Sequence, residues 1–396
     1  MKKNVCLLIY DLGSGGAERV LSQWSRLLSE DYNVFMTLYG HNVTYEYGGE
    51  LCFLEGQANN KNVFTKVLTV LKRAAALKKF VKEKKIDIVI SFCNECNLVN
   101  TLSSHGTEKI CSIRSASDLD SNIFVNYVVK SRNNRIVIQT EALKKTMIER
   151  YGAAIADKLT VFGNPFDSRK IRLLASEDAP ENLKDILENK KTIVSVASFK
   201  RQKNHANLLK CFELVAEQID DAYLLLVGSD STGLREKVRG MAAQSRYADR
   251  IIFVGELKNP YAVIQKSSVF VLPSLAEGIP NVLAEAMICG CPVVASNCPT
   301  GPAELLCEDP SSVAYDKNGV FHGDYGLLVT PFEGSSAYDY EDYSDVNRFF
   351  AKAVASVLQD EEFARELKQK AILGARRFDI EQYKADLVAL VANCLQ

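Results

Sequence analysis

The amino-acid sequence predicts an α/β protein made of two doubly wound, Rossmann-like domains. Short runs of β-branched and other apolar residues alternate with amphipathic segments of helical length. This alternation occurs twice, with a break at Asn164–Pro165 and a polar span that continues to about Asn189. The chain has 396 residues, more than one hydrophobic core usually serves, and its 47% hydrophobic residues are enough to fill two cores. Strands and helices that alternate at these lengths form parallel sheets with helices on both faces.

The first domain is predicted to span residues 1–165. Apolar runs between turn residues predict strands at Asn4–Tyr10, Asn33–Tyr39, Ile86–Phe92, Lys109–Arg114, Arg135–Thr140 and Lys158–Pro165. Amphipathic helices are expected at Gly15–Glu30, Lys61–Lys85, after Phe92, and at Glu141–Gly152. The domain therefore repeats strand and helix in the manner of a doubly wound sheet.

The second domain is predicted to span residues 166–375. Its strands are expected at Thr192–Ser198, Ala222–Ser229, Ile251–Glu256, Ser268–Ser274, Cys291–Ser296 and Tyr325–Thr330, with amphipathic segments at His205–Gln218, Asn259–Ser267 and Asn281–Gly290. Residues 376–396 are predicted to form a last helix that packs back toward the first domain. Because doubly wound sheets bind ligands at the carboxyl ends of their strands, two such sheets facing across a cleft would suit a reaction with two substrates.

Composition excludes several classes of partner and compartment. The net charge of −1 gives no reason to expect nucleic-acid binding. The apolar run after the first lysines stops at Asp11, too early for a signal peptide, and no run of eighteen apolar residues could span a membrane. The eleven cysteines lie largely within predicted strands and helices, which indicates reduced thiols. We therefore expect a cytoplasmic protein, either soluble or attached to the inner face of the cytoplasmic membrane.

Two short motifs could be taken for metal or redox sites. Cys93 and Cys96 form a CxxC pair, but no second pair follows and the four histidines are scattered. Asp118-Leu119-Asp120 spells D-x-D, a pattern that holds a metal ion in some enzymes. We interpret the first motif as small apolar residues after a strand and the second as solvated acids, and expect no metal.

The segment DLGSGGAERV, Asp11–Val20, places three glycines between a buried strand and an amphipathic helix. Gly15 and Gly16 allow close backbone approach, and the start of the helix attracts an anion such as a phosphate. The glycine spacing departs from G-x-G-x-x-G, which disfavours a nicotinamide site. The alternative is a tight turn that binds no ligand.

Cations follow the first strand of the second domain. Lys200, Arg201, Lys203 and His205 lie at the predicted carboxyl end of that strand, just before a helix. Cations in this position are suited to a diphosphate. The alternative is a charged loop exposed to solvent.

The segment SLAEGIPNVLAEAM, Ser274–Met287, places Glu277 in a turn and Glu285 inside the helix that follows. The backbone N–H groups around Gly278, Ile279, Asn281 and Val282 can hold a phosphate, and the two carboxylates can accept hydrogen bonds from hydroxyl groups. A ligand with hydroxyls and phosphate, such as a nucleotide sugar, fits both. Glu285 would then hold the ribose and Glu277 the sugar.

The same segment, with GCPVVASNCPTGPAELL after it, resembles the donor site of family 4 retaining glycosyltransferases, which have the GT-B fold. The resemblance extends over nearly the whole chain, through the Gly-Gly loop, N-P-x-D at Asn164–Asp167, Q-K-N at Gln202–Asn204, LLLVGS, FVGELKNP and YGLLV. It implies a second domain that binds the nucleotide sugar and a first domain that binds the acceptor. It also implies a reaction that needs no metal or other cofactor.

The resemblance implies a role for each matching residue. Lys203 would neutralise the departing diphosphate, Glu277 would contact the transferred sugar near its C3 hydroxyl, and Glu285 would contact the ribose. The backbone from Gly255 through Glu256 to Leu257 would read the base, with uridine preferred. Gly15 and Gly16 would approach the donor phosphate from the first domain.

Two positions depart from the family pattern. Ser198 stands where an arginine is common, so Lys200 or Arg201 would supply that charge. Arg114 stands roughly where many members have a histidine that faces the sugar.

LGSGGAERV and the NPY segment further resemble members that build surface polysaccharides or lipid-linked oligosaccharides, including N-acetylgalactosaminyl transferases that act on undecaprenyl-diphosphate glycans. The predicted function is thus transfer of a hexose or N-acetylhexosamine from a nucleotide sugar to a glycan acceptor linked to a polyprenyl diphosphate.

The segment Lys61–Lys85, with nine basic residues and one acid, could lie on an anionic bilayer or pack on its own sheet. Its apolar positions at helical spacing are Val63, Val67, Val70, Ala74, Leu77 and Val81.

Two other functions remain open from the sequence. A sugar-nucleotide 2-epimerase shares the two-domain architecture, although such enzymes need acid–base histidines that this chain hardly offers. A non-catalytic subunit that binds nucleotide sugars is the third reading, which Ser198 and the missing histidine keep open.

Overall fold

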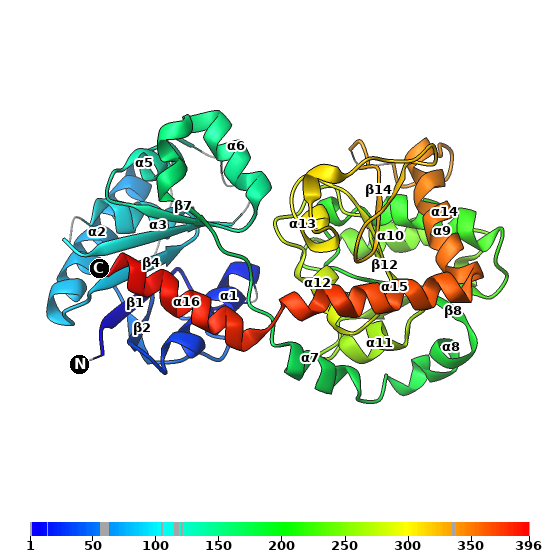
Figure 1. Ribbon diagram of the computed structural model, residues 1–396, viewed down its shortest axis with the longest axis horizontal. Coiled ribbons are helices and arrows are strands. Elements are labelled where there is room, and N and C mark those ends of the chain that lie inside the picture. Colours follow the sequence, from blue (N-terminus) through cyan, green and yellow to red (C-terminus); the bar gives the residue numbers. More distant parts are fainter. Residues whose placement is uncertain are drawn as a thin grey trace. The chain divides into compact units, whose positions relative to one another are not determined.

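The computed structural model describes residues 2–13, 15–55, 63–103, 106–114, 119, 122–334 and 337–395. The chain divides into two compact units (Figure 1). Unit 1 contains Met1–Pro165 and Ile380–Gln396, and unit 2 contains Phe166–Asp379. The first division falls after Pro165, and the chain returns to unit 1 at Ile380, four positions beyond the predicted start at 376.

Unit 1 contains a parallel sheet in the order β3-β2-β1-β4-β5-β6-β7. Its strands are β1 Asn4–Ile9, β2 Asn33–Leu38, β3 Glu50–Phe53, β4 Ile88–Phe92, β5 Glu108–Ile113, β6 Arg135–Ile138 and β7 Leu159–Val161. The strand order reverses between β1 and β4, which is the hallmark of a doubly wound sheet. Strand β3 lies at the edge and is half-exposed, and it was not among the strands predicted from the sequence.

Both faces of this sheet are covered by helices. In β1, Val5, Leu7 and Ile9 belong to one hydrophobic cluster, whereas Cys6 and Leu8 belong to another. This alternation explains why the strand is a continuous apolar run, since both of its faces are buried. The helices are α1 Gly16–Leu28, α2 Val63–Glu83, α3 Asn94–Leu102, α5 Asn122–Lys130, α6 Glu141–Tyr151 and α16 Ile380–Cys394, with the 3₁₀ turn η1 Ala153–Lys158.

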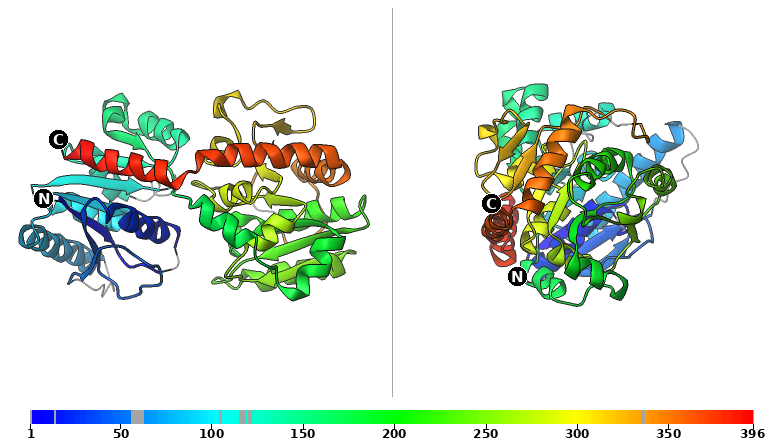
Figure 2. Two further views of the ribbon diagram at one scale, coloured as in Figure 1. Left: turned by 60° about the horizontal axis from the view of Figure 1, so that its bottom comes forward. Right: turned by 90° about the vertical axis from the view of Figure 1, so that its right-hand side faces the viewer.

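The C-terminal helix α16 completes unit 1. It lies beside α1 and buries Leu387, Val391 and Cys394 in the same cluster as α1 (Figures 1 and 2). The hydroxyl of Tyr383 accepts a hydrogen bond from Trp24 Nε1 at 2.7 Å and donates one to the Gly163 carbonyl at 2.9 Å. These contacts explain why the last helix belongs with the first 165 residues.

Helix α2 has two apolar surfaces. Ala74, Leu77 and Val81 are buried against the sheet, as the packing interpretation of this segment requires. Val67, which the sequence pattern placed on the same stripe, is 44% exposed. The side chain of Val63 lies outside the described residues. Among the described residues, no helix has both the length and the hydrophobicity needed to cross a membrane.

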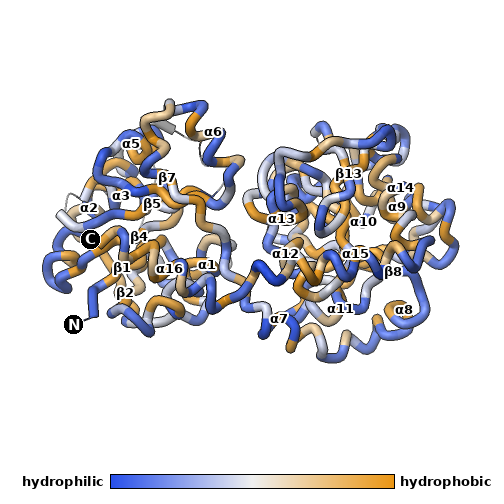
Figure 3. The backbone as a smooth tube through the Cα atoms, viewed as in Figure 1, coloured by the Kyte–Doolittle hydropathy of each residue, from blue (hydrophilic) through white to orange (hydrophobic). Residues whose placement is uncertain are grey.

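Unit 2 contains a second sheet in the order β10-β9-β8-β11-β12-β14-β13, parallel except for the antiparallel edge strand β13. Its strands are β8 Lys191–Val196, β9 Ala222–Val227, β10 Ile251–Gly255, β11 Val269–Leu272, β12 Val293–Ser296, β13 Val320–His322 and β14 Leu327–Val329. Figure 3 shows hydrophobic residues concentrated along the central strands of each unit. The predicted α/β class of two parallel sheets with helices is confirmed.

Helices cover both faces of this sheet as well. They are α7 Ser168–Ala175, α8 Lys184–Asn189, α9 His205–Ala216, α10 Leu234–Ala242, α11 Tyr261–Lys266, α12 Asn281–Ile288, α13 Pro302–Leu306, α14 Asp345–Gln359 and α15 Glu361–Gly374, with the 3₁₀ turns η2 Glu181–Leu183, η3 Arg201–Lys203, η4 Ala248–Arg250, η5 Pro310–Ser312 and η6 Ala375–Arg377. No helix or strand was predicted over residues 345–374, where α14 and α15 lie. The first of these helices begins with a capping box, in which the Ser344 and Asn347 side chains each bond the other residue's backbone N–H.

Candidate active site

The site lies at the carboxyl ends of the strands of unit 2. The turn after β8 carries η3, and the turn after β11 carries Glu277 and leads into α12. Strands β8 and β11 are parallel neighbours, so both turns emerge at the same edge of the sheet. The Leu275 N–H donates a hydrogen bond to the Gln202 carbonyl at 2.8 Å, which ties the two turns together.

An ion pair between Lys203 and Glu277 forms the centre of the site. Lys203 Nζ lies 2.5 Å from Glu277 Oε1, and the Ser274 hydroxyl donates to the same oxygen at 2.6 Å. The side chains are 17% and 7% exposed, respectively. The structure therefore brings together the two residues predicted to be catalytic, which the sequence separates by 74 positions.

The loop after β12 is hydrogen-bonded to the turn that carries Glu277. The Thr300 hydroxyl donates to the Glu277 carbonyl and to the Gly278 carbonyl, the latter at 3.3 Å. Gly301 has a φ of 92°, and a Cβ atom there would lie 2.2 Å from the Gly278 carbonyl oxygen. Only glycine fits this position, because both the backbone conformation and the space exclude a side chain.

Helix α12 begins at Asn281, after Pro280, and places Glu285 in its second turn with 5% of its surface exposed. The side chains of Ile279 and Val282 pack against the hydrophobic core beneath. These two predicted binding residues can therefore offer mainly their backbone groups to a ligand. The start of the helix supplies N–H groups and a partial positive charge suited to an anion.

The predicted base-reading segment follows β10. Gly255 has a φ of 85°, and its carbonyl accepts a hydrogen bond from the Gly228 N–H at 2.8 Å. Leu257 packs against the core, whereas Glu256 is exposed. Strand β10 ends at Gly255, so the peptide groups of Glu256 and Leu257 follow the carboxyl end of that strand.

The remaining cations of the β8 turn differ from Lys203 in their exposure. Lys200 and Arg201 are exposed, and the Lys200 N–H donates to the Ser198 carbonyl at 2.8 Å. Lys203 is only 17% exposed and contacts the Glu277 carboxylate, so the electrostatic argument rests on this lysine.

The other predicted residues lie in unit 1. Gly15 caps α1 and Gly16 begins it, and a Cβ atom on Gly15 would lie 2.0 Å from Glu18 Oε2. The Glu18 carboxylate thus lies at the helix start where a phosphate was expected. Arg114 is buried, donates to Asn164 Oδ1 and lies over the Phe92 ring. Its contacts indicate that it braces the segment before Pro165.

Two buried cysteines, Cys96 of the CxxC motif and Cys298 near Glu277, are neutral thiols. Cys96 is buried, and burial raises its pKa well above the ordinary value, so it is a neutral thiol rather than a redox nucleophile. Burial, with Glu277 nearby, raises the pKa of Cys298 to about 12. Within the part of the chain that the structure describes, no group of His, Cys, Asp or Glu residues could hold a metal ion. Asp118 and Asp120 of the D-x-D motif lie outside the described residues.

His205, at the start of α9, is predicted to make stability depend on pH. Burial, and secondarily Lys203, lowers its pKa from 6.5 to about 4, and its ring stacks on Phe199 at 4.5 Å. The unfolded chain binds this proton more readily, so the free energy of unfolding should fall as pH decreases from 6.5 to 4, by about 3 kcal/mol from this group. Urea unfolding of the wild type and of His205→Phe at pH 7 and pH 4 measures this, and equal losses in both would contradict it.

Comparison with known proteins shows the class of enzyme. Residues 178–320 match the family model of Glycosyl transferases group 1. The chain is a glycosyltransferase. Among its relatives, an uncharacterized glycosyltransferase of Methanocaldococcus jannaschii is 26% identical, with 82% of this chain and 83% of the relative covered. A second relative, from Campylobacter jejuni, is 25% identical, with 94% of this chain and 95% of the relative covered. It is named as an N-acetylgalactosaminyltransferase that acts on a diphospho-undecaprenol-linked saccharide.

A solved structure of Anabaena HepE in complex with UDP matches this glycosyltransferase with a TM-score of 0.73 and 17% identity, covering 99% of this chain and 100% of that one. A likeness at this identity shows the fold, and confirms the two-domain α/β glycosyltransferase fold that the sequence predicts.

Three residues that shape the site were not predicted from the sequence to do so. Ser274 and Thr300 hold the side chain and the backbone of Glu277, and Asn204 shapes the turn after Lys203. Each lies inside a motif that was recognised, but polar residues in turns are common, and the sequence does not show which atoms they reach.

Proposed function

We propose that this glycosyltransferase belongs to family 4 and transfers a hexose or N-acetylhexosamine, with retention at the anomeric carbon. Its donor is a UDP-linked sugar, and its acceptor is a glycan linked to a polyprenyl diphosphate, in the synthesis of a surface polysaccharide or oligosaccharide. The observation that carries the proposal is the contact of Lys203 with Glu277 at the carboxyl edge of the sheet, beside the start of α12.

The pair supplies two complementary functions. When the bond between the anomeric carbon and the diphosphate breaks, negative charge develops on the leaving oxygen. The ammonium of Lys203 and the N–H groups at the start of α12 stabilise this charge, which replaces the role of a metal. The carboxylate of Glu277, held by Ser274, accepts a hydrogen bond from a sugar hydroxyl. No metal or other cofactor is therefore required.

The identity of the donor is tested by thermal stability. The UDP in the structure of Anabaena HepE supports uridine. A screen of UDP-, GDP- and ADP-sugars should show stabilisation by UDP-sugars, because a ligand at one hundred times its Kd stabilises the folded state by about 2.7 kcal/mol. Stabilisation by GDP- or ADP-sugars alone would contradict a uridine donor.

The reaction type is tested with the same donors. Incubation with a UDP-sugar and a lipid extract should give a glycosylated lipid whose new linkage has the anomeric configuration of the donor. An epimer formed without acceptor would instead show a 2-epimerase. Binding of UDP with neither hydrolysis nor transfer, even with the extract, would show a binding subunit.

We place the membrane-linked acceptor near helix α2. Leu68 and Leu71 are 42% and 52% exposed on this helix, next to exposed Lys66 and Lys72. Apolar side chains flanked by lysines can enter the interface of an anionic bilayer. The name of the Campylobacter jejuni relative, which acts on a diphospho-undecaprenol-linked substrate, supports an acceptor of this kind.

Leu71→Glu is therefore predicted to reduce binding to vesicles that contain anionic lipid. The change removes buried apolar area in the bilayer and adds a charge repelled by the headgroups, so the bound fraction should fall by about tenfold or more. Leu373→Glu on α15 is the matched control, since Leu373 is also 52% exposed. Sedimentation with vesicles measures the effect, and equal losses in the two variants would exclude a specific role of α2.

A further inference from the structure

Three buried asparagines link the candidate active site to a distant segment of unit 2. Asn204, Asn207 and Asn347 are 3%, 5% and 1% exposed. Asn204 follows Lys203 directly, Asn207 lies in the first turn of α9, and Asn347 lies in the first turn of α14. We call these three residues the asparagine relay.

Each amide in the relay accepts a hydrogen bond from one side and donates to the other. The Ser344 N–H donates to Asn347 Oδ1 at 3.0 Å, and Asn347 Nδ2 donates to Asn207 Oδ1 at 3.0 Å. Asn207 Nδ2 then donates to Asn204 Oδ1 at 2.9 Å, and Asn204 Nδ2 donates to the Pro273 carbonyl at 3.0 Å.

The ends of the relay fix its direction. A backbone N–H can only donate and a carbonyl can only accept, so every amide between Ser344 and Pro273 has one orientation that satisfies all the bonds. Reversing one amide would place oxygen against oxygen at the next contact. Aligned bonds of this kind also strengthen one another in a buried environment.

One end of the relay lies next in sequence to residues of the ion-pair site, since Asn204 follows Lys203 and Pro273 precedes Ser274. Asn204 has a φ of 57°, a left-handed conformation that asparagine tolerates better than most residues, and it turns the chain between Lys203 and α9. Its side chain holds this turn to Pro273, and the next residue, Ser274, donates to Glu277. The position of Lys203 against Glu277 thus depends on the bond from Asn204.

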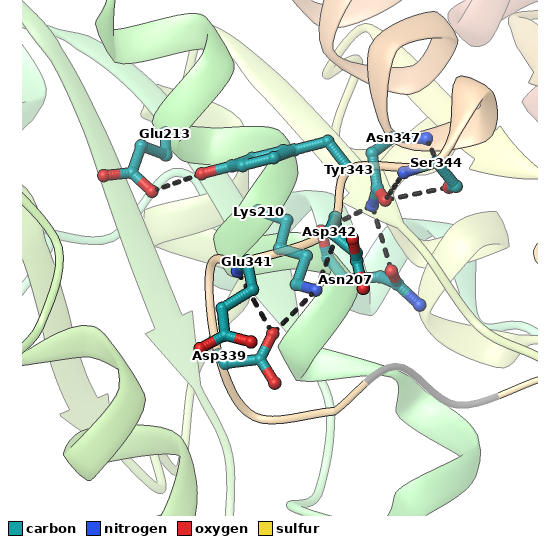
Figure 4. A network of polar contacts seen from close by, with 9 residues as sticks. All are labelled: Asn207, Lys210, Glu213, Asp339, Glu341, Asp342, Tyr343, Ser344 and Asn347. Atoms are coloured by element: carbon teal, nitrogen blue, oxygen red, sulfur yellow. Dashed lines mark hydrogen bonds and ion pairs between the residues drawn. The ribbon is translucent and has the colours of Figure 1, made fainter.

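The other end of the relay is fixed by a segment rich in acids and tyrosines before α14. Figure 4 shows Asn207, Lys210 and Glu213 along one face of α9, where they meet this segment. Lys210 Nζ donates to the Asp342 carbonyl at 2.8 Å and pairs with Asp339 at 3.3 Å. The Tyr343 hydroxyl donates to Glu213 Oε2 at 2.7 Å. These bonds fix residues 339–347 on α9.

We propose that Asn204, Asn207 and Asn347 are positioning residues that hold Lys203 where it meets the donor diphosphate. The segment 339–347 supports the donor site through them without contacting the pair of Lys203 and Glu277. This inference rests on the proposed role of Lys203. It adds that residues of α9 and α14, distant from Lys203 in sequence, determine how well that lysine acts.

The test replaces one relay donor while it keeps the start of α14 intact. Asn347→Asp can still accept from the Ser344 N–H but cannot donate to Asn207, so the amides of Asn207 and Asn204 lose their fixed orientation. The matched control is Ser344→Ala, which removes the hydroxyl that caps α14 and that also donates to Asn347 Oδ1 at 2.8 Å. It keeps the bond from the Ser344 N–H to the same oxygen and the three bonds donated by the amide nitrogens, so the orientation of the relay is retained. Asn204→Gly is a second variant, which keeps the backbone conformation and removes the bond to Pro273.

The measurement is the Kd for UDP by calorimetry, with kcat and KM for the donor where transfer occurs. Asn347→Asp and Asn204→Gly should each raise the Kd by about tenfold, a typical effect within a shared network, whereas Ser344→Ala should leave it unchanged. In a Lys203→Ala background, neither relay variant should raise the Kd further, because the relay acts through Lys203.

The outcomes separate the two proposals. Relay variants that bind UDP as tightly as Ser344→Ala, or that weaken binding equally with and without Lys203, would overturn the positioning role and leave the proposed function standing. A wild-type protein that binds no UDP would overturn the proposed donor, and this inference with it.

Discussion

Lys203→Ala is expected to lower kcat by about two orders of magnitude or more, the usual effect of removing an electrostatic stabiliser of the transition state. The ammonium lies 2.5 Å from Glu277 Oε1, and the lysine side chain is only 17% exposed. A water molecule that fills the space left by the side chain would not supply the lost positive charge. The Kd for UDP should rise as well, because the same group meets the diphosphate. Steady-state kinetics and calorimetry measure the two effects.

The control for this variant must separate catalysis from stability. Alanine at position 203 leaves the Glu277 carboxylate buried without its cation, and breaking a buried pair typically destabilises by about 3 kcal/mol or more. The double variant Lys203→Ala with Glu277→Gln removes the unpaired charge, so it should recover most of the stability and none of the activity. Lys266→Ala, at an exposed position on α11, should behave as wild type. Near-normal turnover in Lys203→Ala would remove this lysine from the mechanism.

Glu277→Gln is expected to reduce transfer by about a hundredfold, because the carboxylate that orients the sugar is lost at the reacting centre. Its effect on the Kd for UDP should be opposite to that of Lys203→Ala. In the absence of donor, the Glu277 carboxylate is paired with the Lys203 ammonium, so the diphosphate must compete with this carboxylate for the lysine. The neutral amide competes less, so the Kd for UDP should fall while transfer is lost.

A donor that lacks the C3 hydroxyl tests the contact directly. If Glu277 accepts a hydrogen bond from that hydroxyl, Glu277→Gln and the deoxy donor remove the same interaction. Their effects on the activation free energy of transfer should therefore not be additive when the two are combined. Full additivity would place Glu277 elsewhere on the sugar. Glu236→Gln on α10, an exposed carboxylate, is the neutral control, and UDP binding weakened by Glu277→Gln would exclude the competition with Lys203.

The fold was predictable because its strands are defined by local patterns. Runs such as Val5–Ile9 and Ala222–Val227 are apolar throughout, as strands buried on both faces must be. The edge strands β3 and β13 were missed, since short and partly exposed strands lack that pattern. Helix α14 was missed although its signal is present, with a cap at Ser344 and apolar residues at Phe350 and Val354.

The site was predictable in its residues but not in its contacts. Glu277, Glu285 and Lys203 were named from motifs, and the chain folds to place Lys203 on Glu277. The burial of Glu285 and the exposure of Leu71 on α2 depend on which face each helix turns to its sheet. The Glu18 carboxylate at Gly15 likewise depends on a side-chain conformation that no motif records.

The sequence alone determined the α/β class, the position of most strands and the chemical groups available to the site, because each follows from residues within a few positions of one another. Only the tertiary structure decided that Lys203 meets Glu277 and that Asn347 is linked to Asn204. These residues are brought together by the order of strands β8 and β11 and by the packing of α14 on α9. Contacts of that kind are set by the whole fold, so no local pattern in the chain encodes them.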